Sequence, residues 1–219
     1  METTIYLVRH AQTDSNAGGR FQGWTDVELN ENGLSQAKRV AERLSYEEIG
    51  VVYCSPLIRT KVTAALIAAR HGVTPQVLPD LAEINYGEWE GKSREEVNAK
   101  WPELLWKMRN DPTGAAIPGG ETYEGFSARC NGVFREVCSL QEGKKVVVVA
   151  HSGVIKAIVL AILRGGNAMW GRIDIDNASI TTIKVISGAP RLTSLNNTTH
   201  LVELKTAPVE IHPSKLVTV

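Results

Sequence analysis

The stretch IYLVRH, residues 5–10, carries four largely apolar side chains followed directly by an arginine and a histidine. Short, nearly continuous apolar runs of strand-forming residues are typical of strands that are covered on both faces. Two further runs, VVYC at 51–54 and VVVV at 146–149, repeat the pattern. The sequence therefore predicts three buried strands.

Helical patterns lie between and after these strands. Residues 34–44 carry apolar side chains at helical spacing among charged ones, residues 57–70 are rich in alanine, and residues 154–163 are apolar throughout. The alternation of strand and helix predicts an α/β fold, a three-layer α/β/α sandwich with a mostly parallel central sheet. Residues 179–186 and 191–195 predict a late hairpin around Gly188.

The stretch from 84 to about 123 interrupts this alternation with three tryptophans, three prolines and two glycine-rich turns. We expect a helical excursion over the site, because segments beyond strand ends commonly shape pockets in such sheets. A surface excursion with its own small core is the open alternative. No linker divides the chain, so we expect a single domain over 1–219, with a tail from about 200 to 219.

Composition excludes several classes of partner. With 24 basic and 24 acidic residues the net charge is zero, which argues against binding nucleic acid or a membrane surface by bulk charge. The three cysteines form no paired motif, which fits a reducing compartment. The chain shows neither a signal peptide nor an apolar run of roughly 20 residues. We therefore expect a cytoplasmic protein.

Charged and polar side chains follow all three predicted strands. Arg9 and His10 end the first, His151 follows the valine run, and Arg59 lies shortly after the VVYC run. Open α/β sheets bind ligands at the carboxyl ends of their strands. The guanidinium fork of arginine matches phosphate oxygens, and the helix that Ser152 opens would offer free N–H groups. The pattern predicts a local site for a phosphate dianion.

Taken together, these residues resemble the histidine phosphatase superfamily, also called the phosphoglycerate mutase-like family. In family order the matching motifs are RHAQT at 9–13 with Asn16, FQG at 21–23 with Asp26 and Leu29, SPL at 55–57 with Arg59, Leu81 with Glu83, WEG at 89–91, GGET at 119–122 and AHSG at 150–153. The resemblance covers roughly residues 4–165. Ala11 stands where the commonest motif has glycine, and we expect a slightly altered backbone there.

The resemblance implies that His10 is the nucleophile and forms a phosphohistidine, with Glu83 as general acid and then general base. Imidazole attacks only when neutral, and cations at Arg9 and Arg59 would keep it so. We expect these arginines and a protonated His151 to stabilise the transferring phosphoryl group. The expected phosphate- or substrate-binding residues are Arg9, Asn16, Gln22, Gly23, Arg59, His151 and Ser152.

Less specific interpretations stand beside these. Glu83 could be a surface carboxylate, and Asn16 and Gln22 could be ordinary turn residues. His10, His151 and Glu83 are also metal-ligand types, but the neighbouring arginines would repel a cation and no His-x-x-x-His pair is present. We expect no metal and no cofactor.

The predicted activity is hydrolysis of a small phosphorylated metabolite. The segment after Glu83 lacks the longer insertion of the mutase branch and resembles the small cofactor-independent phosphatase branch, which includes α-ribazole phosphatases and broad-specificity phosphatases. A phosphoglycerate mutase and a catalytically inactive phosphate-binding module are the alternatives. The tryptophans and Tyr123 could stack on an aromatic leaving group or form the core of the excursion. The expected partner is a small-molecule phosphate ester, without nucleic acid or membrane, and a homodimer stays open.

Overall fold

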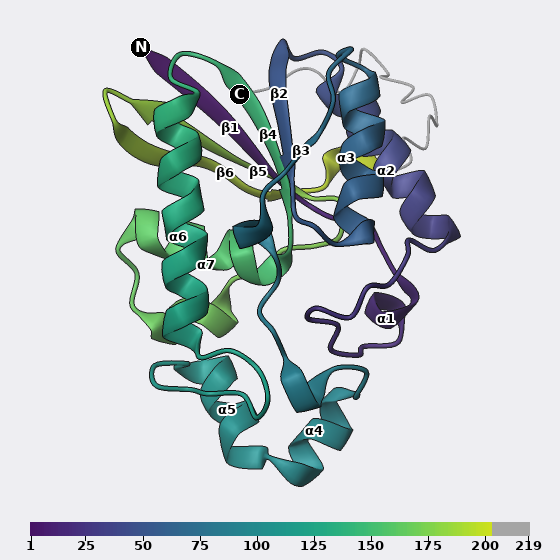
Figure 1. Ribbon diagram of the computed structural model, residues 1–219, viewed down its shortest axis with the longest axis vertical. Helices are drawn as coiled ribbons and strands as arrows, with labels where there is room; N and C mark the ends of the chain where they lie inside the picture. The colour runs from purple at the N-terminus through teal and green to yellow at the C-terminus, as the bar shows by residue number, and fades with distance from the viewer. Residues whose placement is uncertain (203–219) are drawn as a thin grey trace, which may run out of the picture.

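A computed structural model describes residues 1–202 of the 219-residue chain. Its centre is a six-stranded sheet in the order β3-β2-β4-β1-β5-β6 (Figure 1). The strands are β1 (Glu2–Arg9), β2 (Ile49–Cys54), β3 (Gln76–Val77), β4 (Lys145–Ala150), β5 (Ile180–Ile186) and β6 (Ala189–Asn197). The first four strands run parallel, and the β5–β6 hairpin adds two antiparallel strands at one edge. The predicted mostly parallel sheet and late hairpin are confirmed.

Helices cover both faces of the sheet. The α-helices are α1 (Asp14–Ala17), α2 (Glu31–Leu44), α3 (Ile58–Ala69), α4 (Arg94–Lys100), α5 (Pro102–Asn110), α6 (Tyr123–Leu140) and α7 (Ser152–Leu163). In β1, Ile5 and Leu7 pack into the core beneath α6 and α7, whereas Tyr6 and Val8 pack into the core beneath α2 and α3. Because successive strand side chains point to opposite faces, a continuous apolar strand supplies both cores. This arrangement is the predicted three-layer sandwich.

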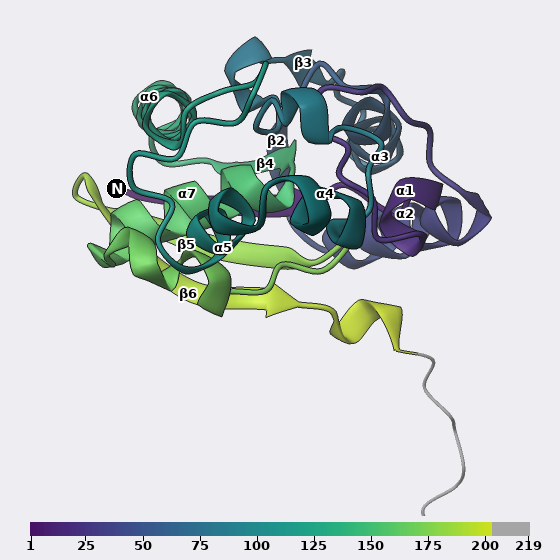
Figure 2. The same cartoon turned by 90° about the horizontal axis from the view of Figure 1, so that it is seen from below.

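The excursion after β3 lies beyond the carboxyl ends of the parallel strands. It contains the 3₁₀ turn η2 (Gly87–Trp89) and helices α4 and α5, and Figure 2 shows both helices lying across the strand ends. Trp89 is fully buried against Phe21, Tyr86 and Trp101, and this aromatic group is continuous with the core beneath α6 and α7. Because the segment lines two cavities at the strand ends and shares the main core, the structure favours the excursion over the site and not the separate surface excursion.

Three further 3₁₀ turns complete the described chain: η1 (Pro79–Leu81), η3 (Asn167–Arg172) and η4 (Thr199–Leu201). The last of these begins the predicted tail, where Leu201 packs against the core beneath α2 and α3. The rest of that tail, residues 203–219 with His212, lies outside the described residues. Within residues 1–202, none of the helices combines the length and the apolar character needed to cross a bilayer.

Candidate active site

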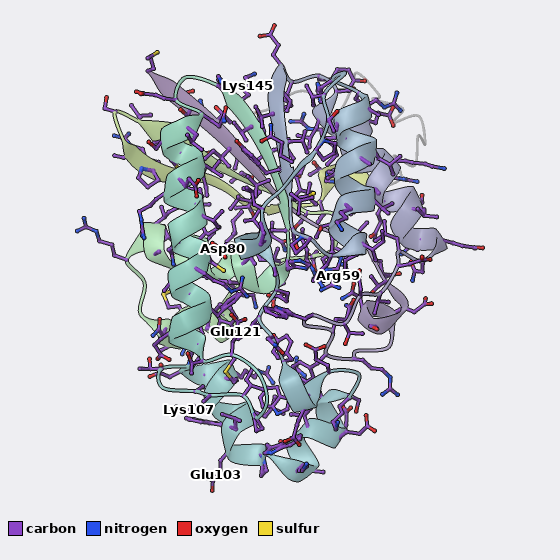
Figure 3. The ribbon with its side chains drawn as sticks, viewed as in Figure 1. Arg59, Asp80, Glu103, Lys107, Glu121 and Lys145 are labelled. Carbon is purple, nitrogen blue, oxygen red and sulfur yellow. The ribbon has the colours of Figure 1, made fainter. Side chains whose placement is uncertain are left out.

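Four neighbouring parallel strands direct polar side chains to one place. Arg9 ends β1 and His10 follows it, His151 joins β4 to α7, Arg59 lies in the first turn of α3 after β2, and Glu83 follows η1 after β3. Figure 3 shows Arg59 at the base of α3, beside the ends of the central strands. Apart from His151, all of them line a single cavity of about 230 Å³.

The two histidines pack edge to face, with ring centroids 5.2 Å apart. Nδ1 of His10 lies 2.7 Å from the carbonyl oxygen of Ala11. A carbonyl oxygen can only accept, so Nδ1 carries the proton and the lone pair of the neutral ring is on Nε2. Nε2 has no hydrogen-bond partner among the described residues, which leaves this nitrogen free to act as a nucleophile.

Burial and neighbouring charges favour the neutral form of both histidines. Burial lowers the pKa of His10 well below its usual value, and the positive charges of Arg9 and Arg59 lower it further. The same causes, burial first and then Arg59, lower the pKa of His151. A protonated His151 at the transition state stays a prediction, because the negative charge of a phosphoryl group would offset these effects.

Both arginines are anchored through the backbone. Nη1 of Arg9 donates to the carbonyl of Ile175 at 2.6 Å. Arg59 donates to the carbonyls of Thr25 and Gly23 at 2.9 and 2.7 Å. Burial lowers the pKa of Arg59 to about 10, which leaves it charged near neutral pH.

Three buried nitrogens of this cluster have no partner among the described residues: Nε of Arg9, Nε of Arg59 and Nδ1 of His151. An unsatisfied buried donor costs about 1–3 kcal/mol, so a bound ligand that accepts from the two guanidinium groups would stabilise the site. His151 is fully buried and lies behind His10 rather than in the cavity lining. It can act through its contact with His10 and through its hydrogen bond to Ser55.

Glu83 is buried, not a surface carboxylate. Its side-chain oxygens accept from the backbone N–H groups of Ile84 at 2.9 Å and Gly153 at 3.1 Å. A Cβ at position 153 would collide with the Glu83 carboxylate, so glycine at the start of α7 allows this approach. The carboxyl group is thus held at the cavity wall, where it can give or take a proton.

The predicted binding residues Asn16, Gln22, Gly23 and Ser152 all line the same cavity. Oδ1 of Asn16 accepts from Asn177 at 3.1 Å, and Oε1 of Gln22 accepts from the Thr13 hydroxyl at 2.9 Å. These side chains also order the loop after β1. Their turn chemistry and their place in the site therefore occur together.

Arg129 is a positioning residue that sequence reasoning missed. Its guanidinium donates to the carbonyls of Asp80, Ala82 and Glu83 and pairs with the carboxylate of Glu121. Glu121 in turn accepts from the N–H of Asn85. The GGET motif thus fixes the backbone that carries Glu83, and Figure 3 shows Asp80 and Glu121 beside α6. The eight-residue separation of Glu121 and Arg129 gave no helical-pair signal.

A second cavity of about 230 Å³ adjoins the first. The two share Phe21, Glu83, Tyr86, Arg94 and Ser152. The second extends between α7, the excursion and η3. Of its residues, Glu83 and Ser152 were predicted site residues, and Phe21, Trp89 and Gly153 belong to the quoted motifs.

Comparisons with known proteins agree with the geometry. The model of the histidine phosphatase superfamily (branch 1) matches residues 5–198. Phosphoserine phosphatase 1 of Hydrogenobacter thermophilus is 35% identical over 199 residues, which cover 91% of this chain and 94% of that protein. The adenosylcobalamin/alpha-ribazole phosphatase of Salmonella typhimurium is 25% identical over 193 residues, covering 88% and 96%.

Solved structures show the same likeness. Two structures of an Entamoeba histolytica phosphoserine phosphatase, a mutant with phosphoserine and a complex with 3-phosphoglyceric acid, each give a TM-score of 0.83. Their sequence identities are 32% and 33%, and each covers 91% of this chain and 100% of the other. The chain is a phosphomonoester hydrolase and belongs to the histidine phosphatase superfamily, branch 1.

Proposed function

We propose that this enzyme hydrolyses small phosphate monoesters through a phosphohistidine on Nε2 of His10. The observation that supports this most is the hydrogen bond from Nδ1 of His10 to the Ala11 carbonyl, which leaves a lone pair on Nε2. In the first step Nε2 attacks phosphorus, the bond from phosphorus to the ester oxygen breaks, and a protonated Glu83 donates its proton to that oxygen.

In the second step Glu83, now a carboxylate, accepts a proton from water as the water attacks the phosphohistidine. The bond between nitrogen and phosphorus breaks, inorganic phosphate forms, and His10 returns to its neutral state. Glu83 fits both roles because its carboxyl group lines the same cavity as His10 and is oriented by two backbone N–H groups.

Phosphoryl transfer depends mainly on positioning and on stabilising charge over the equatorial oxygens. We assign this work to Arg9, Arg59 and the backbone N–H of Ser152 at the start of α7, without a metal. Burial and the charges of the arginines lower the pKa of His151, and the negative charge of a bound phosphate dianion would raise it again. His151 can therefore take up a proton once substrate is bound.

Transfer within the substrate, as in a mutase, would require a phosphoenzyme shielded from water. Arg20 and Arg94 line the site cavity and are exposed, so the cavity is open to solvent, which favours hydrolysis over transfer within the substrate. An inactive binding module is disfavoured because every position needed for the two steps holds a competent residue.

Trapping the intermediate tests this proposal. Wild-type protein, His10→Ala and His71→Ala are mixed with radiolabelled p-nitrophenyl phosphate in EDTA and denatured rapidly. We expect wild type and His71→Ala to hold an acid-labile, alkali-stable label and to release nitrophenol, while His10→Ala does neither. His71 is the matched control because it lines neither cavity. Turnover by wild type without any trapped label, or a labelled His10→Ala, would contradict the mechanism.

We also propose a single domain over 1–219 and a cytoplasmic location. The free thiols of Cys54, Cys130 and Cys138 support a reducing compartment. The homodimer stays a prediction, which sedimentation of the purified protein decides.

A further inference from the structure

The second cavity is placed where the leaving group of a substrate would lie. Glu83 and Ser152 line both cavities. If Glu83 protonates the leaving oxygen, the phosphoryl group lies on the His10 side of Glu83 and the rest of the substrate lies on the other side. The side chains of the second cavity are therefore the ones that meet the leaving group.

Lys156 of α7 lines the second cavity and indicates which kind of leaving group this cavity fits. It follows Ser152 by four residues on α7, so both side chains project from the same face of that helix. Lys156 is half-buried and makes no hydrogen bond or ion pair within residues 1–202. Its Nζ lies over the ring of Trp170, 5.7 Å from the ring centroid.

The charges around Lys156 leave room for a negatively charged ligand. Burial lowers the pKa of Lys156, Asp174 and Glu83 raise it, and Arg9 and Arg94 lower it again. A partly buried ammonium without a paired anion is unfavourable, and an incoming carboxylate would relieve that cost.

The other charged side chains of the second cavity are also mostly positive. Arg94 of α4 and Arg109 of α5 bring two more cations to the cavity, and Asp174 is its only acid besides Glu83 within residues 1–202. With Glu83 assigned to the reaction, three cations face one carboxylate. Because the phosphoryl group is held at the first cavity, this surplus favours a second anionic group on the substrate.

An aromatic leaving group fits this cavity less well. Trp89 is fully buried, and Trp170 is 7% exposed with its ring packed edge to face against Tyr123 and Phe126. Neither ring offers a free face on which an aglycone could stack. Of the excursion tryptophans, Trp89 and Trp101 pack in the core, whereas Trp106 is exposed and lines neither cavity.

Gly171 brings the two sides of the cavity together. A Cβ at this position would collide with the carbonyl oxygen of Arg109, so glycine lets η3 approach the end of α5 closely. This contact holds the helix that carries Arg109 beside the segment that carries Trp170 and Asp174. The cavity is thus built by packing contacts and is not only a gap between surface side chains.

Building on the proposed function, we propose that the second cavity is a carboxylate subsite in which Lys156, supported by Arg94 and Arg109, selects phosphate esters of short carboxylic acids. The ligand class is a phosphomonoester whose leaving group bears a carboxylate a few bonds from the ester oxygen. Lys156 acts on specificity and takes no part in bond making or breaking.

Two substrate pairs isolate the carboxylate. O-phosphoserine and phosphoethanolamine differ by that group and both carry an ammonium, while 3-phosphoglycerate and glycerol 3-phosphate differ by the same group without an ammonium. We expect wild type to prefer the carboxylate member of each pair by about ten- to hundredfold in kcat/KM, the effect of a hydrogen bond to a charged group. Lys156→Met should bring both ratios toward one, mainly by raising KM, and Lys156→Arg should restore part of the preference.

Lys107→Met is the matched control, since Lys107 lies on α5 of the excursion, is half-buried and lines neither cavity (Figure 3). It should keep both ratios at their wild-type values. Wild-type ratios near one, or ratios that Lys156→Met leaves unchanged, would overturn the subsite. Hydrolysis of p-nitrophenyl phosphate by wild type separates the two proposals: if it fails, the phosphatase mechanism fails, and if it proceeds without a carboxylate preference, only the subsite fails.

Discussion

The cavity that contains His10 is the strand-end cavity, and the second cavity, lined by Lys156, is the excursion cavity. The two differ in how firmly their main cationic side chains are fixed. At the strand ends, Arg9 and Arg59 are tied to backbone carbonyls and positioned before any ligand arrives. In the excursion cavity, Arg94 and Arg109 are exposed and Lys156 is unpaired within the described chain.

This difference indicates a division of work. A reaction that depends on stabilising developing charge needs donors fixed in advance, since reorganisation during the reaction would raise the barrier. Recognition of the leaving group tolerates side chains that settle on the ligand. Changes at the strand ends should therefore act mainly on kcat, and changes in the excursion mainly on KM and on the choice of substrate.

The largest expected effect is at Glu83. Glu83→Gln keeps the size of the side chain but removes the transferable proton, so kcat for glycerol 3-phosphate should fall by about 10²–10⁴-fold. p-Nitrophenyl phosphate should lose much less in the labelling step, because nitrophenolate leaves without a proton. Stopped-flow release of nitrophenol and steady-state phosphate release measure the two.

Glu88→Gln, in the excursion but outside both cavities, is the control and should leave both rates near wild type. Equal losses on the two substrates in the labelling step would mean that Glu83 does not protonate the leaving group.

The next prediction compares Arg59, which is fixed by backbone carbonyls, with Arg20, which is exposed at the edge of the same cavity. Arg59→Lys retains the charge but loses the fork that binds two carbonyls, so kcat/KM should fall by about a hundredfold. Arg20, which lines the same cavity, is exposed and pairs with Glu96 at 3.2 Å. Arg20→Lys should change kcat/KM by about threefold or less. Similar losses in both variants would remove the distinction between a preset centre and an adaptable rim.

The sequence predicted the strand-end half of the site well, for a physical reason. A buried parallel strand is a continuous apolar run, so the residue that follows it is easily located, and Arg9, His10 and His151 all occupy such positions. Glu83 was reached only through family motifs. The strand before it, β3, consists of the exposed pair Gln76 and Val77, which leaves no apolar run to recognise.

Other features depend on tertiary packing that no local pattern shows. The excursion cavity requires Lys156 of α7 and Arg109 of α5 to meet across more than forty residues of chain. The lowered pKa of His151 was not predicted, because no local pattern shows that its ring is fully buried against His10. Helix α6 was missed although a signal exists: its buried positions, Tyr123, Phe126, Cys130, Val133, Phe134 and Val137, follow helical spacing.

The neutral histidines predict a pH-dependent stability. In the folded chain the pKa values of His10 and His151 lie well below the unfolded value of about 6.5. Below pH 6.5 the unfolded chain therefore binds more protons than the folded one, and the free energy of unfolding decreases as pH falls. Two such groups give a slope of up to about 2.7 kcal/mol per pH unit.

Urea unfolding between pH 5 and 8 measures this slope, with the stability contribution fully present above pH 6.5. The double variant His10→Asn/His151→Asn should flatten the curve over pH 5–6.5. An unchanged slope in that variant would show that His10 and His151 do not cause the loss of stability at low pH.

The smallest effect concerns the surface of the excursion. Nζ of Lys100 lies 2.9 Å from the Glu88 carboxylate, but both side chains are more than half exposed, and exposed pairs contribute about 0–1 kcal/mol. The pair of Arg129 and Glu121 is much less exposed and also binds three carbonyls, so its loss leaves buried groups unsatisfied. Urea unfolding should show the free energy of unfolding of Lys100→Met within about 1 kcal/mol of wild type, and that of Arg129→Met lower by about 3 kcal/mol.

Because Arg129 also fixes the backbone of Glu83, Arg129→Met should lower kcat for glycerol 3-phosphate, whereas Lys100→Met should not. If Lys100→Met matched Arg129→Met in either measurement, the outer excursion would be as tightly coupled to the reaction centre as the strand ends are, and the division of work between the two cavities would not hold.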